Sequence, residues 1–166
     1  MKDRSARAWI WTSICLQLAG YVLDAAWHGL LNPGKEPQTL GQMIQHLATV
    51  HFLLYIGAAS VLVSTSGALV RRIGRSLIGI ALPVAVVGAW LSAGAEGWHA
   101  YSHLRLDTHS APIAGILSFL GFLVVVLAMA SSRWARRHRP AATSSRPRVA
   151  SAPLAVTRLT TVVTSV

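Results

Sequence analysis

The sequence predicts an all-α membrane protein: a four-transmembrane-helix bundle made of two repeated helical hairpins, with a disordered basic C-terminal tail. The first observation is composition. Of the 166 residues, 53% are hydrophobic and 12% are charged, whereas about a quarter of a soluble domain is charged. The second is that four apolar stretches reach the roughly 20 residues that a membrane-spanning helix needs. The third is that Lys and Arg gather outside these stretches, as they do in membrane proteins.

The first two spans form the first predicted hairpin. The first span covers residues 8–31, and the Asn32-Pro33-Gly34 sequence that follows is typical of a helix end, because Pro and Gly stop helices. The second span covers residues 44–63 and is followed by a basic connection. Each span is long enough to cross the hydrocarbon core of a bilayer.

The last two spans form the second predicted hairpin. The third covers residues 77–100 and contains Pro83, where we expect a mild kink that membrane helices tolerate. The fourth covers residues 111–130, and Pro112 suits its first turn because the first N–H groups of a helix have no partner within it.

The positions of Lys and Arg predict the orientation of the spans. Basic connections lie in the cytoplasm by the positive-inside rule. Both chain termini are therefore predicted to be cytoplasmic, while the loops at 32–43 and 101–110 face outward. The predicted location is the inner membrane of a bacterium. The basic residues that decide this are Lys2, Arg4 and Arg7 before the first span, Arg71, Arg72 and Arg75 between the second and third, and Arg133, Arg136, Arg137 and Arg139 after the fourth.

The chain divides into a cytoplasmic segment 1–7, a transmembrane domain 8–132 and a cytoplasmic tail 133–166. From Ala141 the tail is rich in Ala, Ser, Thr, Arg and Pro without a helical period, which predicts disorder. Its membrane-proximal "RWARRHR" is expected to lie on anionic lipid headgroups. Although the formal net charge is +10, no folded basic domain remains to bind nucleic acid. The expected partners are the bilayer and, as an open alternative, further copies of the chain.

An internal repeat relates the two hairpins. "AWH" at 26–28 ends the first span, and "GWH" at 97–99 ends the third. After each outer loop a histidine is followed six residues later by a glycine, His51 by Gly57 and His109 by Gly115. The repeat predicts two hairpins related by an axis along the membrane normal, as in the parallel repeats of transporters.

Histidines and carboxylates gather at the outward ends of the predicted spans. Asp24 and His28 are four residues apart and share a helix face. Continuation of the third helix past Ala100 would give Glu96, His99 and His103 a common face as well. The return helices add His51 and His109. Because an ionisable group inside a membrane costs at least about 2.5 kcal/mol near its centre, such groups are retained when they are paired or functional. The predicted layer is Asp24, His28, His51, Glu96, His99, His103 and His109.

This layer predicts a mono- or dinuclear transition-metal site for redox or hydrolytic chemistry at the outer leaflet. Imidazole and carboxylate ligands suit zinc, iron or copper. The pattern departs from that of di-iron bundles, which use two Glu-x-x-His sequences where this chain has one. Asp24 and Glu96 are expected to be ligands or a general base, and metal binding is expected to weaken in acid. No residue is assigned a catalytic role.

Two other functions stay open at this level. A haem could lie between His28 or His99 and His51 or His109, which would make the chain an electron carrier. Alternatively, the layer is a structural or pH-responsive network in a scaffold, sensor or transport component. His46 is interpreted as an ordinary interfacial histidine that points away from His51.

Overall fold

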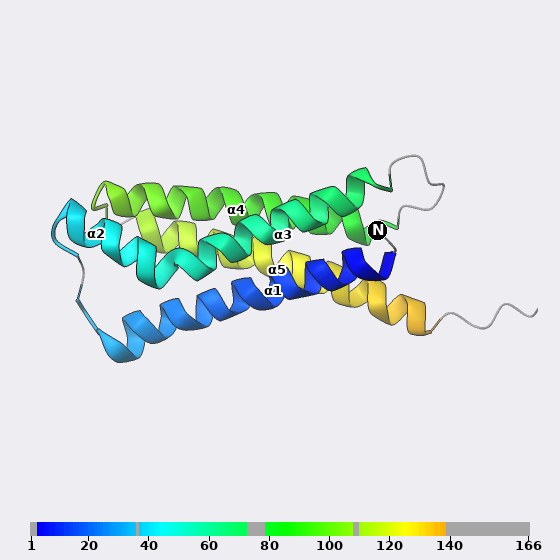
Figure 1. Cartoon of the computed structure of the whole chain (residues 1–166), viewed down its shortest axis with the longest axis horizontal. Coiled ribbons are helices and arrows are strands. Elements are labelled where there is room, and N and C mark those ends of the chain that lie inside the picture. The colour runs from blue at the N-terminus through cyan, green and yellow to red at the C-terminus, as the bar shows by residue number, and fades with distance from the viewer. Residues whose placement is uncertain (1–2, 36, 73–78, 108–109, 139–166) are drawn as a thin grey trace, which may run out of the picture.

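The computed structural model describes residues 3–35, 37–72, 79–107 and 110–138, and within these ranges the chain is helical and contains no strand. The predicted all-α class is therefore confirmed. The helices lie side by side in an elongated bundle (Figure 1). The predicted disordered tail beyond residue 138 lies outside the described residues. The elements are α1 (Asp3–Ala26), the π-helix η1 (Trp27–Leu31), α2 (Leu40–His46), the π-helix η2 (Leu47–His51), α3 (Phe52–Val70), α4 (Ala81–Leu104) and α5 (Ser110–Arg137).

Three helical segments of the described chain are long and apolar enough to cross a membrane. Helix α4 is not among them, because its second half carries the polar side chains of the histidine and carboxylate layer. The surface of the bundle also suits lipid, since large apolar side chains such as Val63, Val87 and Leu127 are about 70% exposed (73%, 69% and 67%). The three segments are Ser5–Leu31, Leu40–Val70 and Ser110–Ala135.

The helix ends agree largely with the sequence prediction. The first helical segment ends at Leu31 with Asn32 as its C-cap, and Gly34 adopts a positive φ of 71° in the following turn. Pro112 lies in the first turn of α5 as predicted. Pro83 differs from the prediction, because α4 begins only at Ala81. A proline in the first turn removes no helical hydrogen bond, so Pro83 has no reason to kink the helix.

Glycines allow close contact within each pair of helices, α1 with α3 and α4 with α5. A side chain at Gly57 would collide with the backbone of Gln17, and one at Gly88 would collide with Gly121. Gly57 therefore allows α1 and α3 to approach closely. Its repeat-related partner Gly115 has no atom within 4 Å of an added Cβ, so the two hairpins do not use this pair of glycines alike.

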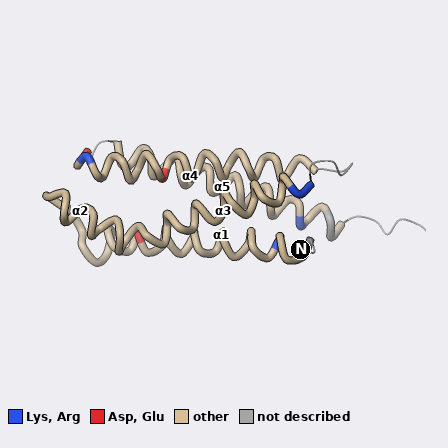
Figure 2. The backbone as a smooth tube through the Cα atoms, turned by 45° about the horizontal axis from the view of Figure 1, so that its top comes forward, with Lys and Arg blue, Asp and Glu red and all other residues tan. Residues whose placement is uncertain are grey.

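The two ends of the bundle differ in charge. Most described Lys and Arg positions lie at the end where helix α1 begins (Figure 2). We call this the basic end, defined by Arg7, Arg71, Arg72 and Arg133. The Arg133 guanidinium lies 5.1 Å from the centre of the Trp11 ring, which brings the end of α5 next to the start of α1.

Towards the basic end the interior is apolar, with a buried cluster that includes Ile10, Val61 and Phe122. A hydrogen-bonded set of four mostly buried polar side chains separates this cluster from the other end of the bundle. The Gln17 side chain donates to the Ser92 hydroxyl at 2.7 Å, and Ser92 lies 3.1 Å from Ser118. The Tyr21 hydroxyl lies 2.6 Å from the Ser118 hydroxyl. These contacts join α1, α4 and α5 at mid-length.

Candidate metal centre

Five imidazoles gather at the end of the bundle opposite the basic end, where η1, α2, η2 and the last turns of α4 meet (Figure 1). We call them the histidine cluster. His51 is 1% exposed, and His46, His99 and His103 are also buried. The side chain of His28 is 29% exposed, so it forms the edge of the cluster. The cluster is His28, His46, His51, His99 and His103.

The prediction that His46 points away from His51 is wrong. The two Nε2 atoms lie 3.1 Å apart. In an α-helix, residues five apart differ by about 140° around the axis and face different sides. The intervening residues, Leu47–His51, are instead a π-helix, whose i→i+5 hydrogen bonds bring residues five apart nearly into line. A prediction that assumed α-helical spacing could not place His46 beside His51. The number of histidines was the only feature of the sequence that pointed to a larger cluster.

The other π-helix, η1, carries His28 at the end of the first helical segment. Its i→i+5 geometry is evident where the Asn32 N–H donates to the Trp27 carbonyl at 2.8 Å. The Asp24 carboxylate lies 3.5 Å from His28 Nε2, as the four-residue spacing predicted. The same carboxylate oxygen lies 3.2 Å from His51 Nδ1. Asp24 thus connects the first helical segment with η2.

The second half of the cluster lies on α4, which continues past Ala100 to Leu104 as its predicted face requires. A carboxylate oxygen of Glu96 lies 3.3 Å from His99 Nδ1, and His99 Nε2 lies 3.0 Å from His103 Nε2. Glu96 is 3% exposed. Its other oxygen, Oε1, has no hydrogen-bond partner among the described residues. A buried carboxylate oxygen in that state is suited to hold a proton, a water or a cation.

His51 joins the two halves. Its ring centre lies 4.8 Å from that of His46 and 5.8 Å from that of His28. It lies 5.1 Å from the ring centres of both His99 and His103. Four imidazoles therefore surround the fifth, and the structure brings together six of the seven predicted site residues. The seventh, His109, lies outside the described residues.

Each carboxylate contacts the Nδ1 atom of a buried imidazole, whose Nε2 atom faces a second imidazole. Asp24, His51 and His46 make one such series, and Glu96, His99 and His103 make the other. An imidazole that donates from Nδ1 to a carboxylate keeps a lone pair on Nε2, which is the form that binds a metal. The Glu96–His99 contact is such a hydrogen bond, so His99 directs an Nε2 lone pair towards His103. The Asp24–His51 contact is an ion-pair distance only, because His51 Nδ1 makes no hydrogen bond among the described residues.

The ligand atoms of His28, His46 and His51 lie within 4.8 Å of one another, so these three residues could hold a metal ion. For comparison, two nitrogens bound tetrahedrally at the zinc–nitrogen distance of 2.0–2.1 Å are about 3.3 Å apart. The Nε2 pairs at 3.0 and 3.1 Å are close to that separation.

A cavity of about 330 Å³ opens beside the cluster. Its wall includes the exposed side of Asp24 and His28 together with Ala111 and Pro112 from the start of α5. His103 also lines it, and this residue lies beyond the third predicted span.

The two tryptophans that precede repeat-related histidines differ in their surroundings. The Trp27 ring centre lies 6.0 Å from that of His46, so it adjoins the cluster. Trp98 is 41% exposed and agrees better with a place among membrane-interface aromatics.

Comparisons with known proteins found no matching family model, no matching curated protein and no matching solved structure.

Proposed function

We propose that this chain is a multi-pass membrane protein that binds one or two transition-metal ions through the Nε2 atoms of the histidine cluster. The observation that carries the proposal is the pair of carboxylate–imidazole series, each with an Nδ1 atom at a carboxylate and an Nε2 atom directed inward. Buried polar groups are costly unless they are paired, and two facing pairs of imidazole Nε2 atoms suit a shared cation.

The proposal assigns the carboxylates a different role from the one first expected. Asp24 and Glu96 orient His51 and His99, and metal ligation falls mainly to the imidazoles. His46 becomes a ligand beside His28 and His51, which is the group that could hold one ion. His99 and His103 offer a second pair of Nε2 atoms for a second ion or a shared one.

An imidazole-rich set favours zinc, copper or iron over magnesium or calcium, which prefer oxygen ligands. Such an ion, when bound, would activate water or oxygen for hydrolytic or redox chemistry. The residues of this chain would hold it, fix the imidazole tautomers and admit a small reactant through the cavity lined by Asp24 and His103. Substrate and reaction class are left open.

A haem fits this geometry less well. An iron between two axial imidazoles lies at about 2 Å from each nitrogen, so those nitrogens are about 4 Å apart. The facing Nε2 atoms here are separated by 3.0 and 3.1 Å. The five imidazoles of the cluster also pack against one another, with ring centres 4.6–6.1 Å apart in the contacting pairs, and so occupy the space that a porphyrin would need.

The membrane arrangement that we propose has four spans in two hairpins, the helices α1–η1, α2–α3, α4 and α5. The same proposal places the chain in the inner membrane of a bacterium, with both termini cytoplasmic. The concentration of Arg7, Arg71, Arg72 and Arg133 at one end of the bundle supports this orientation by the positive-inside rule. The histidine cluster would then face outward.

The main competing function is a metal-free network in which Nε2–H groups donate to facing Nε2 atoms. Elemental analysis of the untagged protein, purified in mild detergent, separates the two. We expect one or two equivalents of a transition metal in the wild type and in the His138→Ala control, and a loss of most of it in His51→Ala. Wild-type protein without metal, even after incubation with zinc, iron and copper, would contradict the proposal.

A further inference from the structure

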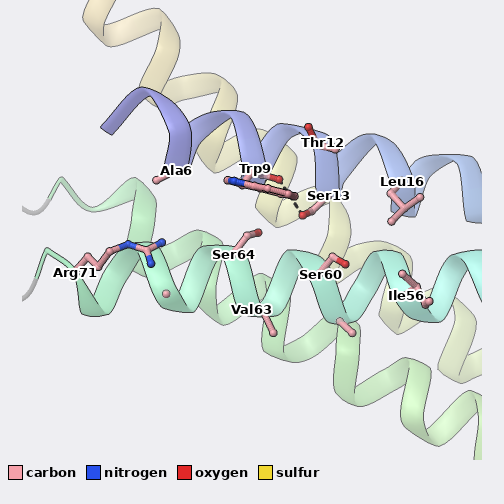
Figure 3. Close-up of a pocket in the computed structure, with 12 residues that line it drawn as sticks. Ala6, Trp9, Thr12, Ser13, Leu16, Ile56, Ser60, Val63, Ser64 and Arg71 are labelled. Carbon is pink, nitrogen blue, oxygen red and sulfur yellow. Dashed lines mark hydrogen bonds between the residues drawn. The ribbon is translucent and has the colours of Figure 1, made fainter. Parts of the chain in front are cut away.

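A groove of about 590 Å³ runs between α1 and α3 in the half of the bundle away from the histidine cluster (Figure 3). Its α1 wall includes Trp9 and Leu16, and its α3 wall includes Ile56 and Val63. Arg71 lies at one end of the groove. The groove belongs to neither the histidine cluster nor its cavity, so its role is independent of metal binding.

The walls of the groove are mostly apolar, and two of the four hydroxyl residues that line it bond to their own helices. The Ser13 hydroxyl donates to the Trp9 carbonyl at 2.9 Å, shown by the dashed line in Figure 3. The Ser64 hydroxyl donates to the Val61 carbonyl at 3.2 Å. Hydroxyls bonded to their own helix have little remaining demand for water, so these positions can contact hydrocarbon.

The length of the groove matches one leaflet of a bilayer. Ile56 and Arg71 mark its ends on α3 and are about 22 Å apart along the axis at 1.5 Å per residue. Half of a bilayer, from headgroups to midplane, is about 20–22 Å thick. Arg71 therefore lies at headgroup depth when Ile56 lies near the midplane.

Arg71 supplies a positive charge at the headgroup end. Its guanidinium lies against Gly67, where an added Cβ would be 3.5 Å from it. The carboxylates whose side chains the structure describes, Asp24, Glu96 and Asp107, lie towards the other end of the bundle. The groove thus combines an apolar channel with a cation at its mouth, which complements an acyl chain with an anionic headgroup.

We propose that this groove binds one acyl chain of an anionic phospholipid from the leaflet at the basic end, with the lipid phosphate at Arg71. A helix from a second copy of the chain fits less well. A helix about 10 Å wide and 22 Å long occupies about 1,700 Å³, well beyond the groove. A single hydrocarbon chain is thin enough to lie between α1 and α3.

The test measures lipid retained by the protein from nanodiscs of equal parts phosphatidylglycerol and phosphatidylcholine, by native mass spectrometry after mild detergent extraction. Arg71→Gln should lower the ratio of retained phosphatidylglycerol to phosphatidylcholine about fivefold, the effect of one basic side chain on attraction to a net anionic headgroup, because the phosphate itself is common to both lipids. The control Arg72→Gln removes the same charge from the neighbouring residue. Because Arg72 does not line the groove, this change should alter the ratio less than twofold.

A second pair of variants tests the channel. Ala59 lines the groove and is exposed, so Ala59→Trp should fill it and remove the retained lipid without disturbing the core. Ala19 is exposed on α1 outside the groove and provides the control, Ala19→Trp. Far-UV circular dichroism checks that each variant folds. Equal effects of Arg71→Gln and Arg72→Gln, or a change of oligomeric state in Ala59→Trp with unchanged lipid, would overturn the proposal.

Discussion

His51 is the residue through which the candidate site is connected. Its Nδ1 atom contacts Asp24 and its Nε2 atom contacts His46. Two further imidazoles, of His99 and His103, have ring centres 5.1 Å away. A side chain that is 1% exposed and touches so many titratable groups is constrained to one orientation. Glu96 matters at this scale because its hydrogen bond sets the tautomer of His99. Asp24 matters because its carboxylate contacts two imidazoles, those of His28 and His51.

Replacing either carboxylate by its amide should therefore weaken metal binding without abolishing it. We expect Asp24→Asn and Glu96→Gln each to raise the metal Kd by about 10- to 100-fold, the usual effect of losing a partner that orients a ligand. His51→Ala should remove most of the metal. Competition with a fluorescent chelator measures the Kd values. Complete metal loss in Asp24→Asn would instead make that carboxylate a ligand.

The residue-scale content of the site was only partly predictable. The four-residue spacing of Asp24 and His28 and the three-residue spacing of Glu96 and His99 follow α-helical periodicity, and the structure contains both contacts. His46 and His51 violate that periodicity, because their alignment depends on a π-helix. Propensity does not distinguish a π turn from an α turn, so a spacing of five residues was interpreted as opposite faces.

At the scale of helices, η2 determines whether the cluster can form. A π turn is an α-helix with one additional residue, and such turns are frequent at functional sites. An α-helix would place these two histidines about 140° apart at their spacing of five residues, so the π turn is what brings them onto one face. One further residue in this segment would rotate α2 by about 100° relative to α3 and move His46 away from His51.

Insertion of one alanine after Ala48, an exposed residue of η2, should separate the two histidines, because residues six apart differ by about 120° around an α-helix. We expect metal affinity to fall at least about tenfold, since losing one ligand commonly costs more than losing an orienting partner. Far-UV circular dichroism should be unchanged. The control is Ala48→Gln, which keeps the length of the segment. Unchanged affinity in the insertion variant would show that His46 is not a ligand.

The repeat gives a matched comparison at the same scale. Gly57→Ala would place a methyl group against the backbone of Gln17 and should destabilise the protein by about 1–3 kcal/mol, as overpacking does. Gly115→Ala has open space and should be neutral or slightly stabilising. Thermal unfolding in detergent measures both. Equal losses of stability would indicate that the two hairpins pack alike.

At the scale of the whole molecule, composition and length sufficed to predict an all-helical, membrane-compatible chain. The approximate helix limits also followed, since Asn32 and Pro112 lie at or next to helix ends. Packing was harder to predict. Which glycines allow close contact depends on the register between helices, and register is set by side-chain fit that a single sequence does not display.

The separation of the histidine cluster from the basic end predicts one-sided access. In proteoliposomes loaded with metal, a membrane-impermeant chelator outside should remove the metal only from molecules whose histidine end faces outward. A protease added outside cleaves the basic tail only in molecules of the opposite orientation, so the uncleaved fraction gives the fraction whose histidine end faces outward. The fraction of metal stripped should equal that uncleaved fraction. If the impermeant chelator removed all the metal from uniformly oriented molecules whichever side it was added to, one-sided access would be contradicted.

The apolar half of the bundle has a bioenergetic consequence. No Asp, Glu, His, Lys or Arg occurs in residues 8–23, 52–70, 79–95 or 110–132. The buried hydroxyls of Ser13 and Thr65 in this half donate to carbonyls of their own helices. In the proposed membrane arrangement, a proton used or released at the histidine cluster would therefore exchange with one aqueous phase. Chemistry at this site would neither consume nor build a transmembrane proton gradient, so its driving force must come entirely from the reactants.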